Sequence, residues 1–136
     1  MSLELEFEGI EELLNSLDEA GLNSDKKVRN FLNNEGREFI KAAKDNTPEG
    51  PTGNLKKSYV SMNIKKDLKD YEKPIRNKAY YHPFVNNGHP QVSSKGKVSG
   101  FVPGVHYIEK TVAQMEDEYY RNVNRFIDDL FEELSK

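Results

Sequence analysis

The three histidines, with the carboxylate nearest to them, are the side chains of this chain that could bind a metal ion or act as a general base. His82, His89 and His106 are separated by 7 and then 17 residues, and Glu109 follows the last of them. These spacings match no pattern of metal ligands, and two of the histidines lie in a stretch rich in glycine and proline. We therefore expect histidines in turns or at the surface, and no metal.

Other residue types that take part in catalysis are present without the partners that catalysis needs. Thr52 and Ser58 have no histidine nearby in the sequence to activate them. The glycines match neither the dinucleotide-binding nor the phosphate-binding fingerprint. Paired carboxylates near the C-terminus are expected to stay solvated and ionised, away from an apolar stripe: Glu116, Asp117, Glu118, Asp128, Asp129, Glu132 and Glu133. We expect no catalytic residue and no cofactor. A small hydrolase remains an alternative that would require a histidine beside a carboxylate in a cleft.

The composition describes a polar chain with one core. Its 136 residues suit a single domain, 35% of them are apolar and 32% are charged, and there is no cysteine. The absence of cysteine excludes disulfides and thiolate chemistry. No apolar run approaches the roughly 20 residues that cross a bilayer, and the N-terminus lacks the regions of a signal peptide. We expect a soluble protein, made and used in a cytoplasm, without membrane contact.

Charge is segregated along the chain. Residues 1–50 carry 6 basic against 12 acidic residues, residues 51–104 carry 10 against 3, and residues 105–136 carry 4 against 8. A basic middle between acidic ends favours either an anionic partner such as DNA or the pairing of opposite faces between neighbouring subunits. Plain solvation of charged surfaces is the third interpretation.

Apolar periodicity predicts a strand and two helices in the first third. Residues 3–7 alternate between apolar and acidic, as in a half-buried strand. Residues 10–20 carry apolar side chains at helical spacing and precede Gly21, which predicts a short helix. Asn23-Ser24-Asp25 supplies capping residues for a second helix, which must end before Pro48.

The middle of the chain predicts strands and then a loop. Residues 58–66 alternate in polarity, and residues 67–70 read as a turn into a second strand. Because Pro74 has no N–H to donate, this second strand is expected to begin there or to lie at a sheet edge. Residues 88–104 hold four glycines and two prolines, which predicts a long, exposed and mobile loop or a loose hairpin.

The last third predicts one long helix. Apolar residues recur every three or four positions from Ile108 to Leu134. About 28 residues span roughly 42 Å, as long as a compact domain of this size is wide. The expected fold is therefore a single α+β domain over residues 1–136. It has a small, mostly antiparallel β-sheet packed by N-terminal helices and a long C-terminal helix, with a mobile loop near 88–104.

Three short motifs follow one another along the chain. They are Pro51-Thr52-Gly53-Asn54-Leu55-Lys56-Lys57-Ser58, the Tyr-rich segment from Tyr80 to His89, and Gly100-Phe101-Val102-Pro103-Gly104. In this order, and with an amphipathic helix after them, the chain resembles the small neck proteins of long-tailed double-stranded DNA phages and prophages. The resemblance covers about residues 8–130. The acidic residue usual before the glycine of the second motif is Asn86 or Asn87 here.

The resemblance implies a non-enzymatic virion component. Such proteins join the head connector to the tail, by head–tail joining or tail completion, and work as a ring of copies. It implies other neck, connector and tail proteins as partners, and the virion neck as the location after assembly in the host cytoplasm. Brief contact with DNA in the pore is compatible with the basic middle. The alternative function is a nucleic-acid-binding module that uses the basic region 56–78.

Two sets of residues are singled out within these motifs. The first set is expected to be structural, with the threonine capping a short helical turn, the glycine allowing a bend, the leucine anchoring the turn and the serine starting a strand: Pro51, Thr52, Gly53, Leu55 and Ser58. The second set is expected to contact a partner, with filling of the core as the alternative for some members: Tyr80, Tyr81, Phe84, Val85, Gly88, His89, Phe101, Val102, Pro103, Gly104 and Tyr107.

Overall fold

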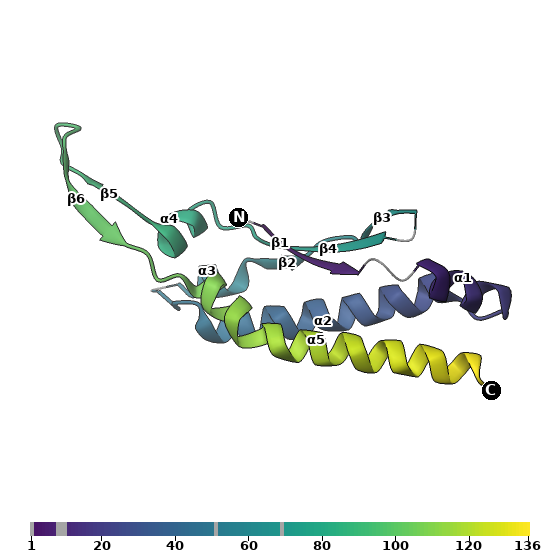
Figure 1. The fold of residues 1–136 in the computed structure, drawn as a ribbon. Helices are drawn as coiled ribbons and strands as arrows, with labels where there is room; N and C mark the ends of the chain where they lie inside the picture. The colour runs from purple at the N-terminus through teal and green to yellow at the C-terminus, as the bar shows by residue number, and fades with distance from the viewer. Residues whose placement is uncertain (1, 8–10, 51, 69) are drawn as a thin grey trace.

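Two long helices lie side by side along the molecule, and a small sheet covers one side of them (Figure 1). The computed structural model describes residues 2–7, 11–50, 52–68 and 70–136, with side chains from residue 11 onward. The long helices are α2 (Ser24–Asn46) and α5 (Tyr107–Leu134), and the short helix α1 (Glu11–Glu19) lies at the end where the chain finishes. The fold is α+β, as the sequence predicts.

The N-terminal helices follow the signals in the sequence. The predicted helix over 10–20 is α1, and Ile10 lies outside the described residues. Helix α2 starts where the Asn23 side chain accepts a hydrogen bond from the backbone N–H of Lys26 at 3.1 Å. It ends at Asn46, before Pro48, and its buried residues form one stripe that faces the sheet and α5.

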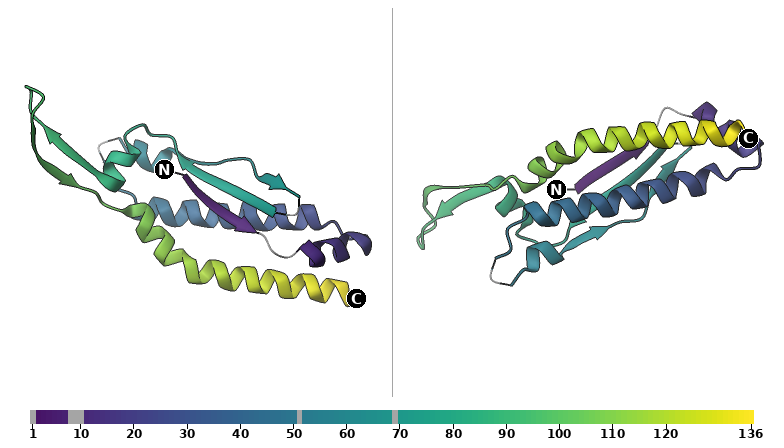
Figure 2. Two further views of the ribbon diagram at one scale, coloured as in Figure 1. Left: turned by 45° about the horizontal axis from the view of Figure 1, so that its top comes forward. Right: turned by 90° about the horizontal axis from the view of Figure 1, so that it is seen from below.

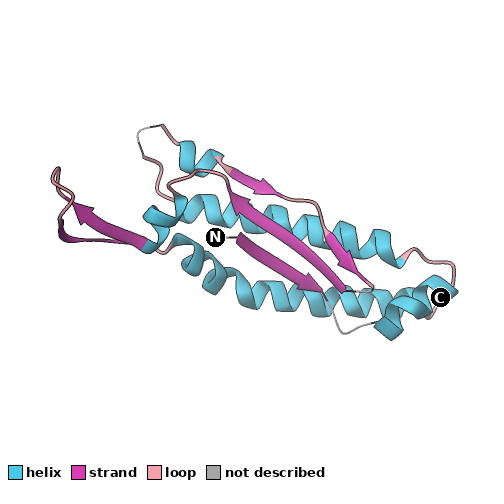
Figure 3. Cartoon of the chain, turned by 90° about the horizontal axis from the view of Figure 1, so that it is seen from above, coloured by secondary structure: helices cyan, strands magenta, loops and turns pink. Residues whose placement is uncertain are grey.

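The main sheet is antiparallel throughout and is built around one strand (Figure 3). Strand β4 (Asp70–Asn77) lies between β1 (Ser2–Phe7) on one side and β2 (Tyr59–Ser61) on the other, and β3 (Lys65–Asp67) also pairs with β4. Residues 58–66, predicted as one strand, therefore form two short strands, with residues 62–64 between them.

Pro74 corrects the prediction for the second strand, because it lies within the central strand and not at its start or at an edge. It pairs in register with Glu4 of β1, and its carbonyl accepts from the N–H of Met62 at 3.0 Å. In an antiparallel strand the N–H and C=O of one residue point to the same neighbour. The nitrogen of Pro74 therefore faces residues 62–64, where neither β2 nor β3 continues, so the missing N–H breaks no strand pairing.

The core consists of two clusters of buried residues between the sheet and the helices. The first joins α2, the short helix α3 (Asn54–Lys57) and the start of α5: Phe39, Ala43, Leu55, Tyr59, Ile75, Ala79, Tyr107 and Ile108. The second joins α1, the start of α2 and the end of α5: Leu14, Leu17, Val28, Leu32, Tyr71 and Leu130. Because α2 and α5 supply both clusters, their packing holds the two halves of the molecule together.

Helix α5 packs along α2 over its length, as Figure 2 shows from two further directions. The rings of Phe31 and Phe126 stack with centroids 4.5 Å apart. Polar bridges also join the helices: Asn122 donates to the Glu35 carboxylate at 3.0 Å, and burial raises the pKa of that carboxyl group. The acidic residues of α5 are otherwise mostly exposed, away from this contact.

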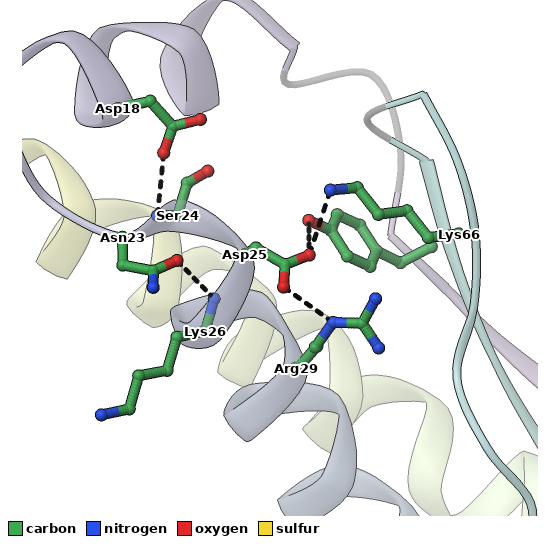
Figure 4. A network of polar contacts seen from close by, with 8 residues as sticks. Asp18, Asn23, Ser24, Asp25, Lys26, Arg29 and Lys66 are labelled. Atoms are coloured by element: carbon green, nitrogen blue, oxygen red, sulfur yellow. Dashed lines mark hydrogen bonds and ion pairs between the residues drawn. The ribbon is translucent and has the colours of Figure 1, made fainter.

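A polar network ties the start of α2 to the sheet (Figure 4). The carboxylate of Asp25 accepts from Arg29 Nε at 2.9 Å, from Lys66 Nζ at 3.1 Å and from the Tyr71 hydroxyl at 2.9 Å. Partial burial opposes ionisation of Asp25, but the hydrogen bonds from Lys66, Tyr71 and Arg29 lower its pKa. One carboxylate at the helix N-terminus, where the helix dipole favours negative charge, thus holds the β3–β4 end of the sheet.

A second, separate hairpin extends from the end opposite α1 (Figures 1 and 2). It consists of β5 (Gly88–Val92) and β6 (Val98–Pro103), which pair antiparallel after the short helix α4 (His82–Asn87). Residues 88–104 therefore adopt the hairpin form, the second of the two that the sequence predicts, and the mobility of this segment stays a prediction.

Candidate partner-binding surface

Asn86 joins α4 to the start of α5 and so sets the base of the hairpin. Its side-chain Oδ1 accepts from the backbone N–H of Ile108 at 2.9 Å, and its Nδ2 donates to Glu109 at 3.1 Å and to Asn87 at 2.9 Å. Its backbone carbonyl accepts from the N–H of His106 at 2.9 Å. Asn86 is fully buried, so these bonds satisfy groups that water does not reach.

His82 and Tyr107 form a buried polar pair beneath the surface. The Tyr107 hydroxyl contacts His82 Nδ1 and also donates to the backbone carbonyl of His82 at 3.4 Å. Burial raises the pKa of Tyr107 and lowers the pKa of His82, because each charged form loses its hydration. Both groups are therefore neutral near pH 7, and they act as packing and hydrogen-bonding residues of the core.

Two glycines allow close backbone contacts at the base of the hairpin. A Cβ atom on Gly88, which has φ +87°, would lie 2.6 Å from the carbonyl oxygen of Val102. A Cβ atom on Gly104 would collide with the backbone carbonyl of Asn86. The Gly88 and Gly104 of the sequence motifs are thus required by close backbone contact.

Above this base lies an apolar groove of about 640 Å³, which we call the hairpin groove. Its walls come from α4, from both strands of the hairpin and from the segment before α5. Phe84 is 53% exposed in it, and Val92 and Val102 are also exposed. The lining residues are Tyr80, Tyr81, Phe84, Val85, His89, Pro90, Val92, Val102, Pro103 and Val105. An open apolar groove rimmed by aromatic rings has the chemistry of a protein-binding surface.

The structure brings together most of the residues that the sequence singles out for partner contact. Seven of them line the hairpin groove: Tyr80, Tyr81, Phe84, Val85, His89, Val102 and Pro103. Gly88 and Gly104 shape its base instead, and Phe101 is 62% exposed on the hairpin but does not line the groove. Tyr107 is fully buried in the core, which is the alternative that the sequence leaves open for such aromatic residues.

Sequence reasoning misses three residues of the groove, Pro90, Val92 and Val105. They carry no motif. Pro90 and Val92 lie on β5, whereas Val105 is placed by the hydrogen bond from its N–H to the Val85 carbonyl of α4 at 2.9 Å. Their apolar character in a segment rich in serine, lysine and glycine is the one signal that singles them out.

The first motif lies beside the groove and supports it. The Thr52 hydroxyl accepts from the N–H of Asn54 at 3.2 Å, Gly53 has φ +66°, and Leu55 is buried in the first core cluster. The Asn54 side chain donates to the Tyr81 hydroxyl at 3.1 Å, which connects α3 to the groove wall. Ser58 caps α3 and precedes β2 at Tyr59, and Pro51 lies outside the described residues.

Not every cation of the basic middle is free for an outside partner. Lys73 points into the interior, where its Nζ donates to the Met62 carbonyl at 2.6 Å, and burial lowers its pKa. Lys66 forms an ion pair with Asp25. Arg76 and Lys78 are exposed at the sheet surface. Two of the cations in the region 56–78 thus serve the fold.

One histidine lies beside a carboxylate, with His106 Nδ1 3.4 Å from Glu109 Oε2, and both side chains are exposed. No cluster of three potential metal ligands occurs among the described residues. Within the same residues, no helix has the length and apolar content that a membrane span requires.

The profile of one protein family matches residues 11–88, which are 78 of the 136 residues. The family is HK97-gp10-like, described as "Bacteriophage HK97-gp10, putative tail-component". The match runs from the start of α1 through the first motif and strands β2, β3 and β4 to the first residue of β5. No curated protein and no solved structure matched the chain.

Proposed function

Because the chain belongs to the HK97-gp10-like family of bacteriophage structural proteins, we propose that it is a neck protein that joins the head connector to the tail. Membership of this tail-component family is the observation that carries the proposal. From this membership we infer a structural role in the phage particle, with other phage structural proteins as partners.

The hairpin groove supports a role in docking. An exposed groove of about 640 Å³, with aromatic residues on its walls, leaves apolar surface in water until a partner covers it. Helix α4 and the hairpin, which form most of its walls, lie at one end of an elongated molecule, where a partner can reach them without contact with the two-helix body (Figure 1). We propose that the hairpin groove contacts a connector or tail protein.

We further propose that several copies assemble as a ring in the neck. The acidic helices and the basic middle of the chain would then attract each other between neighbouring copies. Exposed charge pairs are screened by salt, so high salt should weaken this assembly. Light scattering at low and high salt measures the effect, and an unchanged mass would remove the electrostatic part of the proposal.

A phage genome that lacks the gene tests the neck role directly. We expect infected or induced cells to accumulate filled heads and free tails that do not join, visible by electron microscopy. Supplying the protein from a plasmid should restore joined particles. If joined particles form at the normal level without the gene, the neck role is wrong. A defect confined to tail length or capsid size would assign the protein to another structural step.

A DNA-binding test separates the alternative function from this one. The structure gives that alternative less support, because Lys73 is buried and Lys66 is bound to Asp25. Purified protein in a gel-shift assay should bind DNA weakly at moderate salt. Tight binding with a steep salt dependence would instead favour the nucleic-acid-binding module.

A further inference from the structure

The hairpin exposes large apolar side chains to solvent. Val98 is 69% exposed and Phe101 is 62% exposed, and neither lines the hairpin groove. Two-stranded hairpins are marginally stable alone in water. This one projects from the body, so a partner that covers its exposed apolar side chains would stabilise it (Figure 1).

The hairpin is also basic. Residues 88–104 contain Lys95 and Lys97 at the tip and no acidic residue. A partner surface that suits it is therefore apolar at its centre and acidic at its rim.

The opposite end of the same molecule has a surface of this kind. A groove of about 630 Å³, which we call the end groove, lies between α1 and the last turns of α5. Its apolar lining is Leu13, Ile127, Phe131 and Leu134, and Phe131 is 56% exposed. Glu11 and Glu12 also line it. It thus complements the hairpin in both polarity and charge.

We propose that the hairpin of one copy docks into the end groove of a second copy, with Phe101 as its apolar anchor and the two lysines beside Glu11 and Glu12. The hairpin lies at the end of the molecule opposite α1 and the last turns of α5, so it cannot reach the end groove of its own chain (Figure 1). The contact is heterologous and repeats from copy to copy, which closes a ring if the rotation allows. The inference rests on the proposed assembly of several copies and names the surfaces that carry it.

The apolar anchor and the ion pairs of this contact should contribute unequally to self-association. Exposed ion pairs contribute little and mainly speed association, whereas a buried aromatic anchor supplies much of the affinity. Removing Phe101 or Phe131 should therefore weaken self-association by about 10-fold or more. Reversing the charge of Lys97 should have a smaller effect that disappears at high salt.

Two variants, used separately and then mixed, test the contact. Phe101→Ser has a damaged hairpin and an intact end groove, and Phe131→Ser has the reverse. Each alone should be monomeric by light scattering where the parent protein self-associates. An equimolar mixture has one good hairpin and one good groove, so it should form heterodimers of one copy each and nothing larger.

Tyr120→Ser is the matched control, because Tyr120 is 58% exposed on α5 and lines neither groove. It should associate like the parent. Circular dichroism of each variant shows whether the fold is retained. A second readout uses the absence of cysteine: Lys97→Cys and Glu12→Cys copies should form mixed disulfides on oxidation, in preference to Lys97→Cys with Asp117→Cys.

Several results would overturn the contact. These are full assembly by either phenylalanine variant, a mixture that stays monomeric, or disulfides that form mainly between two Lys97→Cys copies. A parent protein that is monomeric at every concentration tested would also overturn it. The gene-deletion experiment is independent of all these results, so the neck role can hold while this contact fails.

Discussion

The side-chain oxygen of Asn86 accepts a hydrogen bond from the backbone N–H of Ile108 at 2.9 Å, across 22 positions of sequence. This bond satisfies one of the unpaired N–H groups at the start of α5 and fixes α4, and with it the hairpin, against the long helix. The same amide donates to Glu109, so the site uses both ends of the Asn86 side chain.

Replacing Asn86 should therefore destabilise the whole protein. Asn86→Ala removes a buried cap and should lower the free energy of unfolding by about 1–3 kcal/mol. Asn86→Asp keeps the acceptor for Ile108 but places a second carboxylate beside Glu109. Its deficit relative to the parent should shrink as the pH falls and one carboxylate is protonated. Urea unfolding at pH 7 and pH 5 measures both effects, and a pH-independent deficit for Asn86→Asp would contradict the proposed repulsion.

Gly88→Ala should disrupt the base of the hairpin. The added methyl group would lie 2.6 Å from the Val102 carbonyl oxygen, and an alanine at φ +87° is strained as well. Gly96→Ala is the matched control, since Gly96 has φ +79° at the hairpin tip with no atom near its Cβ position. Both variants carry the backbone strain, of about 1 kcal/mol, but only the first carries the collision. Equal thermal unfolding temperatures for the two variants would show that the collision is relieved at no cost.

His82 should make the protein less stable in weak acid. Burial lowers the pKa of His82 in the folded protein, so below its unfolded pKa of about 6.5 the unfolded chain binds a proton that the folded chain does not. This contribution to stability is present above that pH and is lost as the pH falls. In His82→Gln the decline between pH 7 and pH 5.5 should be shallower, measured by thermal unfolding at each pH.

His89→Gln is the control for that measurement, because His89 lies at the hairpin surface rather than in the core. It should keep the pH dependence of the parent protein. If the pH profile of the unfolding temperature flattens equally in both variants, the buried imidazole of His82 does not cause the loss of stability in weak acid.

Asp25 should contribute stability at neutral pH that disappears in strong acid. Its pKa is lowered in the folded protein, so the contribution is complete above its unfolded pKa of about 3.9 and is lost as the pH falls through the folded pKa. Asp25→Ala removes hydrogen bonds from Arg29, Lys66 and Tyr71, at a cost of about 1–3 kcal/mol. Asp45→Ala, an exposed change on the same helix, should fall within about 0.5 kcal/mol of the parent in urea unfolding. If the two variants lose the same free energy of unfolding, the hydrogen bonds of Asp25 contribute no measurable stability.

We infer that residues 1–136 form one folding unit, because α2 and α5 contribute to both core clusters. A single unfolding transition, seen alike by circular dichroism and by tyrosine fluorescence, is the expected result. Two separate transitions would divide the chain into units.

Elements whose signals are local can be predicted from the amino-acid sequence. Apolar residues every three or four positions and the Asn23 cap predict α1, α2 and α5 close to their observed ends. The motif residues from Thr52 to Ser58 predict a turn between helix and sheet, and the glycines and prolines of 88–104 predict an exposed loop or hairpin. The aromatic run from Tyr80 is likewise visible in the sequence, because its composition differs from that of its neighbours.

Features that depend on residues far apart in the chain become visible only in the folded protein. Pro74 lies in the central strand because its nitrogen faces the gap between β2 and β3. Tyr107 is buried in the first core cluster, where its hydroxyl contacts His82. Lys73 is buried with its ammonium group donating a hydrogen bond to the Met62 carbonyl. Periodicity reports which face of an element is apolar, but not which element covers that face. Long-range pairing settles that, and with it which aromatic residues enter the core and which remain exposed for a partner.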